Sequence, residues 1–161
     1  MTMEKTPGGS YGARVPRGKL LGKLMESMAR VQIAMYRRSG GARMSRMMGF
    51  PVVLLTTMGA RSGKPRTTPI GGFADGEDAW LVVASLAGAA HHPAWFINMV
   101  QNPDDIWLEV GKRRIKVKAE SLLGADRQAA MGRVVAIAAR YGDYQEKTDR
   151  EIPVVRLTPA A

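Results

Sequence analysis

The pattern that most constrains the fold of this chain is a series of short apolar and β-branched runs separated by turn-forming residues. Six runs of strand length occur, at residues 52–57, 66–73, 79–85, 106–110, 114–121 and 152–157. Parallel strands would need a helical crossover between most neighbours, whereas only two helical patterns, at residues 94–100 and 126–140, interrupt these runs. The sequence therefore predicts an α+β fold, mainly β, built as a six-stranded antiparallel barrel with flanking helices.

The first 50 residues differ in composition from the rest. They hold 10 Lys and Arg against 2 Asp and Glu, together with 8 of the 11 methionines. Residues 1–18 are rich in glycine and proline, which predicts a flexible tail. Leucine and methionine then recur at helical spacing, so residues 19–50 are expected to form a basic amphipathic helix over residues 19–38 and a linker. Residues 51–161 are expected to form the barrel domain.

Composition excludes several kinds of site. The chain has no cysteine, which removes disulfides, thiolate metal ligands and a cysteine nucleophile. Its two histidines, His91 and His92, are neighbours without an obvious carboxylate constellation, so no metal site is expected. The apolar stretches are too short to span a bilayer and the first residues lack the apolar core of a signal peptide, so we expect a soluble, cytoplasmic protein. The net charge of +10 keeps a nucleic-acid-binding module as a non-enzymatic alternative.

The most informative motif is the basic turn at residues 59–66, Gly-Ala-Arg-Ser-Gly-Lys-Pro-Arg. Its glycines allow backbone N–H groups to approach an anion, and its three cations supply charge-assisted hydrogen bonds to phosphate or carboxylate oxygens. A Walker A loop is excluded, because Pro65 stands where that loop needs Ser or Thr and a strand follows in place of a helix. The turn is either an anion-binding loop or an ordinary solvated hairpin turn.

Aromatic and amide side chains are candidates for binding a planar ring. Trp95 and Asn98 are three residues apart on the first predicted helix and share a face, although core packing is an equal alternative for Trp95. Tyr141 and Tyr144 follow the second helix, where a phenol can donate a proton to a substrate or serve only structure. No nucleophile elbow and no Gly-x-Gly-x-x-Gly turn is present, so an enzyme of this sequence would depend on a bound cofactor.

Several motifs, in order, extend through most of the chain. They are Met35-Tyr36-Arg37-Arg38, residues 51–66 including the basic turn, Val83-Ala84-Ser85, His92-Pro93-Ala94-Trp95-Phe96, Asn98 with Asn102-Pro103, Asp143-Tyr144-Gln145, Thr148-Asp149-Arg150 and Ile152-Pro153-Val154-Val155. Together they resemble the deazaflavin (F-420)-dependent nitroreductase family, the split β-barrel F-420-dependent reductases of actinobacteria. The resemblance implies a split β-barrel of FMN-binding type, coenzyme F-420 as cofactor and no metal.

The resemblance also implies roles for individual residues. The coenzyme's phosphate and acidic tail would be held by Arg61, Ser62, Gly63, Lys64 and Arg66. The deazaflavin ring would be lined by Thr68, Pro69, Ala84, Ser85, Trp95 and Asn98. The candidates for donating a proton on the substrate side are Ser85, Tyr141 and Tyr144.

The implied reaction is hydride transfer from the reduced deazaflavin to a hydrophobic, electron-poor small molecule. Quinones, conjugated enones, lactones such as coumarins and aflatoxins, and nitroaromatics form this class. Gly71 replaces a tyrosine and Leu86 a lysine of the nitroimidazole-activating relative, which argues against that drug class. An FMN-dependent split-barrel oxidoreductase is the alternative enzyme.

Partners are predicted from the same features. We expect no nucleic acid partner if the chain is such a reductase, and a monomer or homodimer. Residues 19–38 are expected to cover the substrate opening or to make a weak peripheral contact with an anionic membrane.

Overall fold

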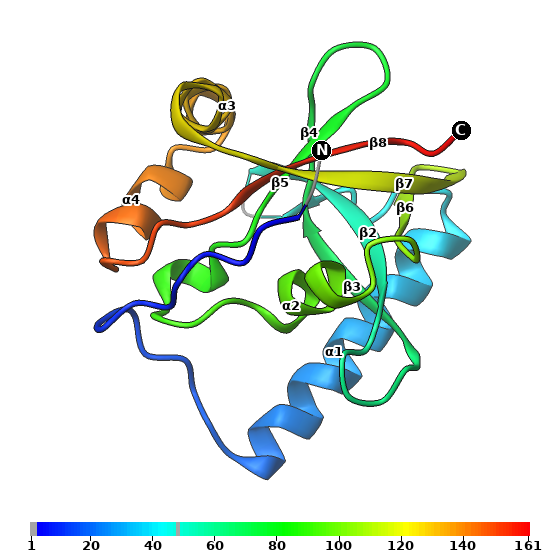
Figure 1. Ribbon diagram of the computed structural model, residues 1–161. Coiled ribbons are helices and arrows are strands. Elements are labelled where there is room, and N and C mark those ends of the chain that lie inside the picture. Colours follow the sequence, from blue (N-terminus) through cyan, green and yellow to red (C-terminus); the bar gives the residue numbers. More distant parts are fainter. Residues whose placement is uncertain (1–2, 48) are drawn as a thin grey trace.

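The computed structural model describes residues 3–47 and 49–161, and its centre is one antiparallel sheet (Figure 1). The strands are β1 (Arg46–Met47), β2 (Phe50–Met58), β3 (Pro65–Gly71), β4 (Phe73–Ala74), β5 (Trp80–Val83), β6 (Trp107–Val110), β7 (Arg113–Leu122) and β8 (Val154–Pro159). Their order is β1-β2-β6-β7-β8-β5-β4, and β3 pairs with β2. Every strand pair in the described part of the chain is antiparallel, which agrees with short hairpin connections between consecutive strands.

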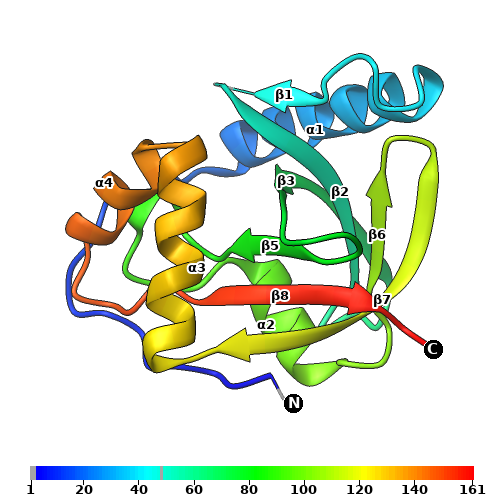
Figure 2. The same cartoon turned by 90° about the horizontal axis from the view of Figure 1, so that it is seen from above.

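In the part of the chain that the structure describes, four α-helices and one 3-10 turn surround the sheet. They are α1 (Lys19–Arg38), α2 (Ala94–Gln101), α3 (Gly124–Ile137), α4 (Arg140–Glu146) and the turn η1 (Leu86–Gly88). Figure 2 shows α3 and α4 together at one end of the sheet, while α1 runs along another side. Helix α1 contacts β3, and α2 contacts β2.

Two apolar clusters hold these elements together. The first lies between the sheet and α2, where Leu55, Phe96 and Leu108 are fully buried. The second packs α3 and α4 against the sheet through residues that include Phe73, Val134 and Tyr141. Alternating strand residues supply both clusters because successive side chains point to opposite faces of a sheet.

The mixed α+β fold is confirmed, but the strand count of six is wrong. All six predicted strands are present, while the strand predicted at residues 66–73 divides at Gly72 into β3 and β4, and the two-residue β1 was missed. The N–H of Gly72 still donates to the carbonyl of Pro51, 3.1 Å away, but the next residue, Phe73, pairs with Leu81 of β5 and no longer with β2. The helix predicted at residues 126–140 is also two helices, since Ala138 has non-helical backbone angles and turns the chain so that Tyr141 becomes buried.

The segment predicted as a flexible tail contains no helix or strand between residue 3 and α1, but it does not hang free. The amide of Gly9 donates to the carbonyl of Ala90 at 2.8 Å, and that of Ala13 donates to Gly88 at 2.9 Å. In Figures 1 and 2 this segment passes the end of the molecule that carries α4 before it enters α1. Its partners lie far away in sequence, so local composition gave no sign of them.

Candidate functional site

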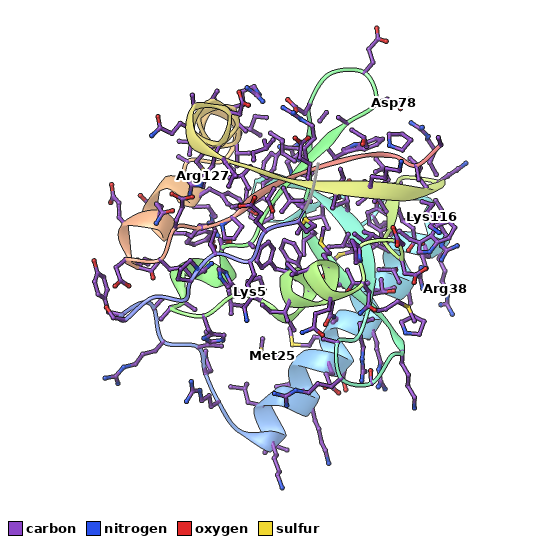
Figure 3. The ribbon with its side chains drawn as sticks, in the orientation of Figure 1. Lys5, Met25, Arg38, Asp78, Lys116 and Arg127 are labelled. Carbon is purple, nitrogen blue, oxygen red and sulfur yellow. The ribbon has the colours of Figure 1, made fainter. Side chains whose placement is uncertain are left out.

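A cleft of about 1440 Å³ lies between α1, α2, β3 and the loop that joins β2 to β3. Helix α1 forms one wall with residues from Met25 to Arg38, and α2 forms the opposite wall with Ala94, Trp95, Ile97 and Asn98. Figure 3 shows Met25 on the side of α1 that is turned toward α2. A volume of this size admits a large cofactor and leaves room for a substrate.

The cleft is lined by more cations than acids. Its described lining contains Arg30, Arg37, Arg38, Arg61 and Arg66, and among these lining residues Glu26 is the one acid. The side chains of Arg61 and Arg66 make no hydrogen bond or ion pair with any residue that the structure describes. Unpaired guanidinium groups beside a cleft attract phosphate and carboxylate groups.

The α1 wall is fixed to the sheet at its C-terminal end. Arg37 binds Glu109 of β6 through two hydrogen bonds of 2.8 Å, which raises the pKa of its guanidinium. The hydroxyl of the buried Tyr36 accepts a bond of 2.8 Å from the amide of Gly111. These contacts keep the cationic end of α1 beside the cleft.

The basic turn is closed by its own backbone and held by α2. Gly59 donates to the carbonyl of Lys64, and the amide of Gly63 donates back to Gly59, both at 2.8 Å. Gly63 adopts a φ of 64°, in the left-handed region that glycine enters without strain. The Oδ1 of Asn98 accepts from the amide of Ala60 at 2.9 Å, and its Nδ2 donates to the Thr57 hydroxyl. Asn98 therefore orients the turn.

The structure brings most of the predicted coenzyme residues together. The cleft lining includes Arg61, Ser62, Arg66, Thr68, Pro69, Trp95 and Asn98. Gly63 and Lys64 lie in the same turn, exposed, and are not part of the lining. Trp95 is only 8% exposed, so it serves the first apolar cluster and the cleft wall at once. The two alternatives for this residue, core packing and ring binding, are thus compatible.

Ala84 and Ser85 are not part of the cleft lining. They follow β5, are buried, and direct their carbonyls at the guanidinium of Arg150, 3.0 Å away in each case. Their predicted contact with the coenzyme ring stays a prediction.

The two predicted tyrosines lie in the second apolar cluster and do not line the cleft either. Tyr141 is 5% exposed and packs edge-on against Phe50, Phe73 and Tyr144, with ring centroids 5.4–5.6 Å apart. Burial raises the pKa of Tyr141, so its phenol stays protonated and keeps a proton to donate. Its role in proton donation also stays a prediction.

The structure places α1, which was expected to cover the substrate opening, in the wall of the cleft. Sequence reasoning missed the Asn102 amide that binds the loop between β2 and β3, and the burial of Arg150. The Nδ2 of Asn102 donates to the carbonyl of Met58 at 3.2 Å, beside the basic turn. Asn102 and Arg150 belong to motifs that carried the family resemblance, which was a signal for both. Nothing in residue spacing indicates that a charged side chain such as Arg150 is 1% exposed.

The described residues form an antiparallel α+β protein whose cation-lined cleft also presents threonine, proline and tryptophan side chains, and these features suit an anionic cofactor with a flat ring. A family model described as F-420H(2)-dependent quinone reductase matches residues 28–159. The chain belongs to this family. It is therefore an oxidoreductase, its coenzyme is F-420, and the resemblance seen in the sequence is confirmed.

Individual relatives agree with this assignment. An F-420H(2)-dependent quinone reductase of Mycobacterium tuberculosis is 39% identical over 135 residues, which cover 81% of this chain and 89% of that protein. A solved F-420-H2-dependent reductase has a TM-score of 0.60 at 35% identity, and the match covers 66% of this chain and 93% of that one. A structure described as a domain-swapped dimer has a TM-score of 0.63 at 29% identity, covering 86% of this chain and 99% of that one.

The described residues lack two kinds of feature. No three or more His, Asp or Glu side chains in residues 3–47 and 49–161 are grouped so that they could hold a metal ion. Within the same residues, no helix combines the length and the apolar character that crossing a membrane requires.

Proposed function

We propose that the cleft between α1, α2 and β3 binds coenzyme F-420 and that the protein uses it to reduce quinones. The observation that carries this proposal is the pair Arg61 and Arg66 at the edge of the cleft. Among the residues that the structure describes, neither arginine has a hydrogen-bond or ion-pair partner, and Glu26 is the one acidic residue of the lining. A phosphate and an acidic tail match this distribution of charge. The quinone reductase family supplies the reaction.

In this proposal the basic turn holds the charged part of the coenzyme. Arg61 and Arg66 bind its phosphate and carboxylates, with Lys64, Ser62 and Gly63 at the exposed rim. Thr68 and Pro69 of β3 and Trp95 of α2 form the surface along which the deazaflavin ring lies. When bound, the reduced coenzyme supplies a hydride from its central ring. The protein binds both reactants, orients them and excludes water.

The apolar residues of α1 form the side of the cleft for the substrate. Met25, Ala29 and Ile33 face a flat, hydrophobic, electron-poor molecule across from the coenzyme surface. Quinones are the first substrate class, and conjugated enones, coumarin and aflatoxin lactones and nitroaromatics share the same electronic character. Ser85, Tyr141 and Tyr144 are the proposed proton donors. Gly71, at the end of the cleft-lining strand β3, lies directly against the Tyr141 hydroxyl, which supports Tyr141 among them.

We also propose a particular barrel and a particular assembly. If the strands are followed from neighbour to neighbour, they form a path of seven that begins at β3 and ends at β4. These two end strands are consecutive in the chain and are joined by Gly72, which supports closure of residues 51–161 into a split barrel with residues 19–50 as an added unit. The domain-swapped relative supports a homodimer over a monomer.

The outer stripe of α1 supports a weak contact with an anionic membrane. Leu24, Met28 and Val31 on this stripe are 56–64% exposed and lie beside several cations.

A binding experiment separates this proposal from its alternatives. The purified protein is titrated with F-420, with FMN and with double-stranded DNA at two salt concentrations, and the fluorescence of each cofactor is followed. We expect saturable binding of F-420 and no comparable binding of FMN. Preference for FMN would favour the flavin enzyme, and salt-sensitive DNA binding without F-420 binding would favour the nucleic-acid module.

A further inference from the structure

Arg150 is the largest fully buried side chain of the described residues, at 1% exposure. No carboxylate in the described part of the chain lies within 4.0 Å of its guanidinium. A buried charge without an ion-pair partner is costly unless every donor is used. Arg150 therefore needs a set of fixed acceptors.

Those acceptors all lie in the connection between β5 and α2, residues 84–93. The guanidinium donates to the carbonyls of Ala84, Ser85 and Ala89 at 3.0 Å and to the Nδ1 of His92 at 2.9 Å. One side chain thus fixes four positions across nine residues of loop. Hydrogen bonds from a charged donor are stronger than neutral ones and set direction as well as distance.

The same connection contains backbone that needs support. Leu86 and Ala87 have φ values of 43° and 53°, in the left-handed region that residues with a Cβ rarely adopt. Such a conformation is strained and persists only where neighbouring structure determines it. Both strained residues lie between Ser85 and Ala89, whose carbonyls Arg150 binds.

The connection leads directly into the cleft. Pro93 ends it, and α2 then places Trp95 and Asn98 in the cleft wall. His92 packs on Phe96 of α2 with ring centroids 4.9 Å apart, so its position bears on the orientation of this helix. Asn98 in turn holds the basic turn through Ala60.

The N-terminal segment closes the other side of the same cluster. The Nε2 of His92 binds the carbonyl of Thr6 at 2.7 Å, and the hydroxyl of Thr148 donates to the carbonyl of Tyr11 at 2.7 Å. Asp149 accepts from the amide and the hydroxyl of Ser10. Residues 148–150 therefore join the N-terminal segment to the β5–α2 connection.

We propose that Arg150 is a positioning residue for the coenzyme cleft, acting through the β5–α2 connection on the orientation of α2 and the basic turn. The part that concerns coenzyme affinity rests on the proposed function. The part that concerns the conformation of residues 84–101 does not. Arg150 touches neither coenzyme nor substrate in this proposal.

The test compares Arg150→Lys with Arg127→Lys in the full chain. A lysine keeps the charge but loses the planar fork that reaches several carbonyls at once. Arg127 is a matched control, because it is also mostly buried and donates to the carbonyl of Ile152, yet makes no bond to residues 84–93. Figure 3 places it on α3, far from the cleft. Amide hydrogen exchange, F-420 affinity, and kcat and KM for the reduced coenzyme are measured for both variants.

We expect Arg150→Lys to speed exchange across residues 84–101, to raise the Kd and KM for the coenzyme about tenfold and to change kcat less than about twofold. Arg127→Lys should lower stability without these changes. Equal effects of the two variants, or unchanged exchange and affinity in Arg150→Lys, would overturn the proposal.

A second variant applies if Arg150→Lys does not fold. His92→Phe removes one of the four acceptors and should speed exchange in the same region. Unchanged exchange in His92→Phe would count against the proposal. A wild-type protein that binds no F-420 would refute the proposed function, while the exchange measurement would still decide the positioning role.

Discussion

Arg61 and Arg66 differ from Arg150 in exposure and in partners, which predicts different consequences of substitution. The first two are exposed and unpaired beside the cleft, so their removal should leave the fold intact. We predict that Arg66→Ala or Arg61→Ala weakens F-420 binding about tenfold, since each removes a charge-assisted contact worth about 1.5–3 kcal/mol. Fluorescence titration measures this. Arg114→Ala is the control, because Arg114 stacks on Trp107 outside the cleft. If both cleft variants bind F-420 as tightly as the wild-type protein, the basic turn is not part of the coenzyme site.

Gly71 is packed so closely that adding a side chain there should lower the stability of the fold. A Cβ at this position would collide with the hydroxyl of Tyr141 and lie 3.2 Å from the Phe50 ring. Gly71→Ala should therefore lower the free energy of unfolding by about 1–3 kcal/mol, as overpacking does. The double variant Gly71→Ala/Tyr141→Phe should recover part of this loss, because the colliding oxygen is gone. Urea denaturation measures both. Additive losses would mean that the hydroxyl is not the obstacle.

The N-terminal segment and the β5–α2 connection should respond together to pH through His92. Burial lowers the pKa of His92, and the charges of Arg150, Lys5 and His91 act in the same direction, while the Thr6 carbonyl opposes them. Because Nδ1 accepts from Arg150, the neutral ring carries its proton on Nε2 and donates to Thr6.

The sign of the pH dependence follows from this lowered pKa. Above the ordinary histidine pKa of about 6.5 the ring is neutral in both states and contributes no slope. Below it the unfolded chain gains a proton that the folded protein resists, so the free energy of unfolding falls as the pH decreases toward the lowered value. Thermal denaturation between about pH 7 and about pH 5 should show a smaller loss in His92→Gln, which cannot gain that proton. Equal losses in both proteins would contradict this assignment.

Helix α1 has two apolar faces with separate expected roles. Met25 and Ile33 line the cleft, whereas Leu24 and Met28 are exposed on the outer stripe. We predict that Leu24→Ser/Met28→Ser reduces sedimentation with anionic vesicles and leaves F-420 affinity and quinone turnover unchanged. Ile33→Ser should raise the KM for a hydrophobic quinone without affecting vesicle binding. Absence of vesicle binding by the wild-type protein would eliminate the membrane contact.

At the scale of the whole molecule, local patterns predicted elements well and their junctions poorly. The strand at residues 52–57 and the helix at residues 19–38 follow from side-chain periodicity, which is a property of a few neighbouring residues. The division of β3 from β4 at Gly72 and the break at Ala138 depend on contacts with distant segments, and the sequence gives no local sign of them.

The same distinction applies to the site. Residue types and spacing were enough to select the basic turn and Trp95, since an anion site needs cations and glycines in one short loop. The Arg150 cluster could not be derived, because it arises where segments separated by dozens of residues meet. A structural role for Tyr141 was one of the two alternatives, but its ring partners Phe50 and Phe73 lie far away in the sequence and could not be named in advance.

The central claim is that this protein transfers hydride from reduced F-420 to quinones. The most direct test mixes the purified protein with reduced F-420 and menadione and follows the return of the oxidised coenzyme's absorbance, with NADPH as the alternative donor and the Arg61→Ala/Arg66→Ala protein as control. We predict rapid, protein-dependent reoxidation of F-420 that requires the quinone, no activity with NADPH, and a raised KM for the reduced coenzyme in the double variant. Reoxidation no faster than without protein, or equal use of NADPH, would contradict the account.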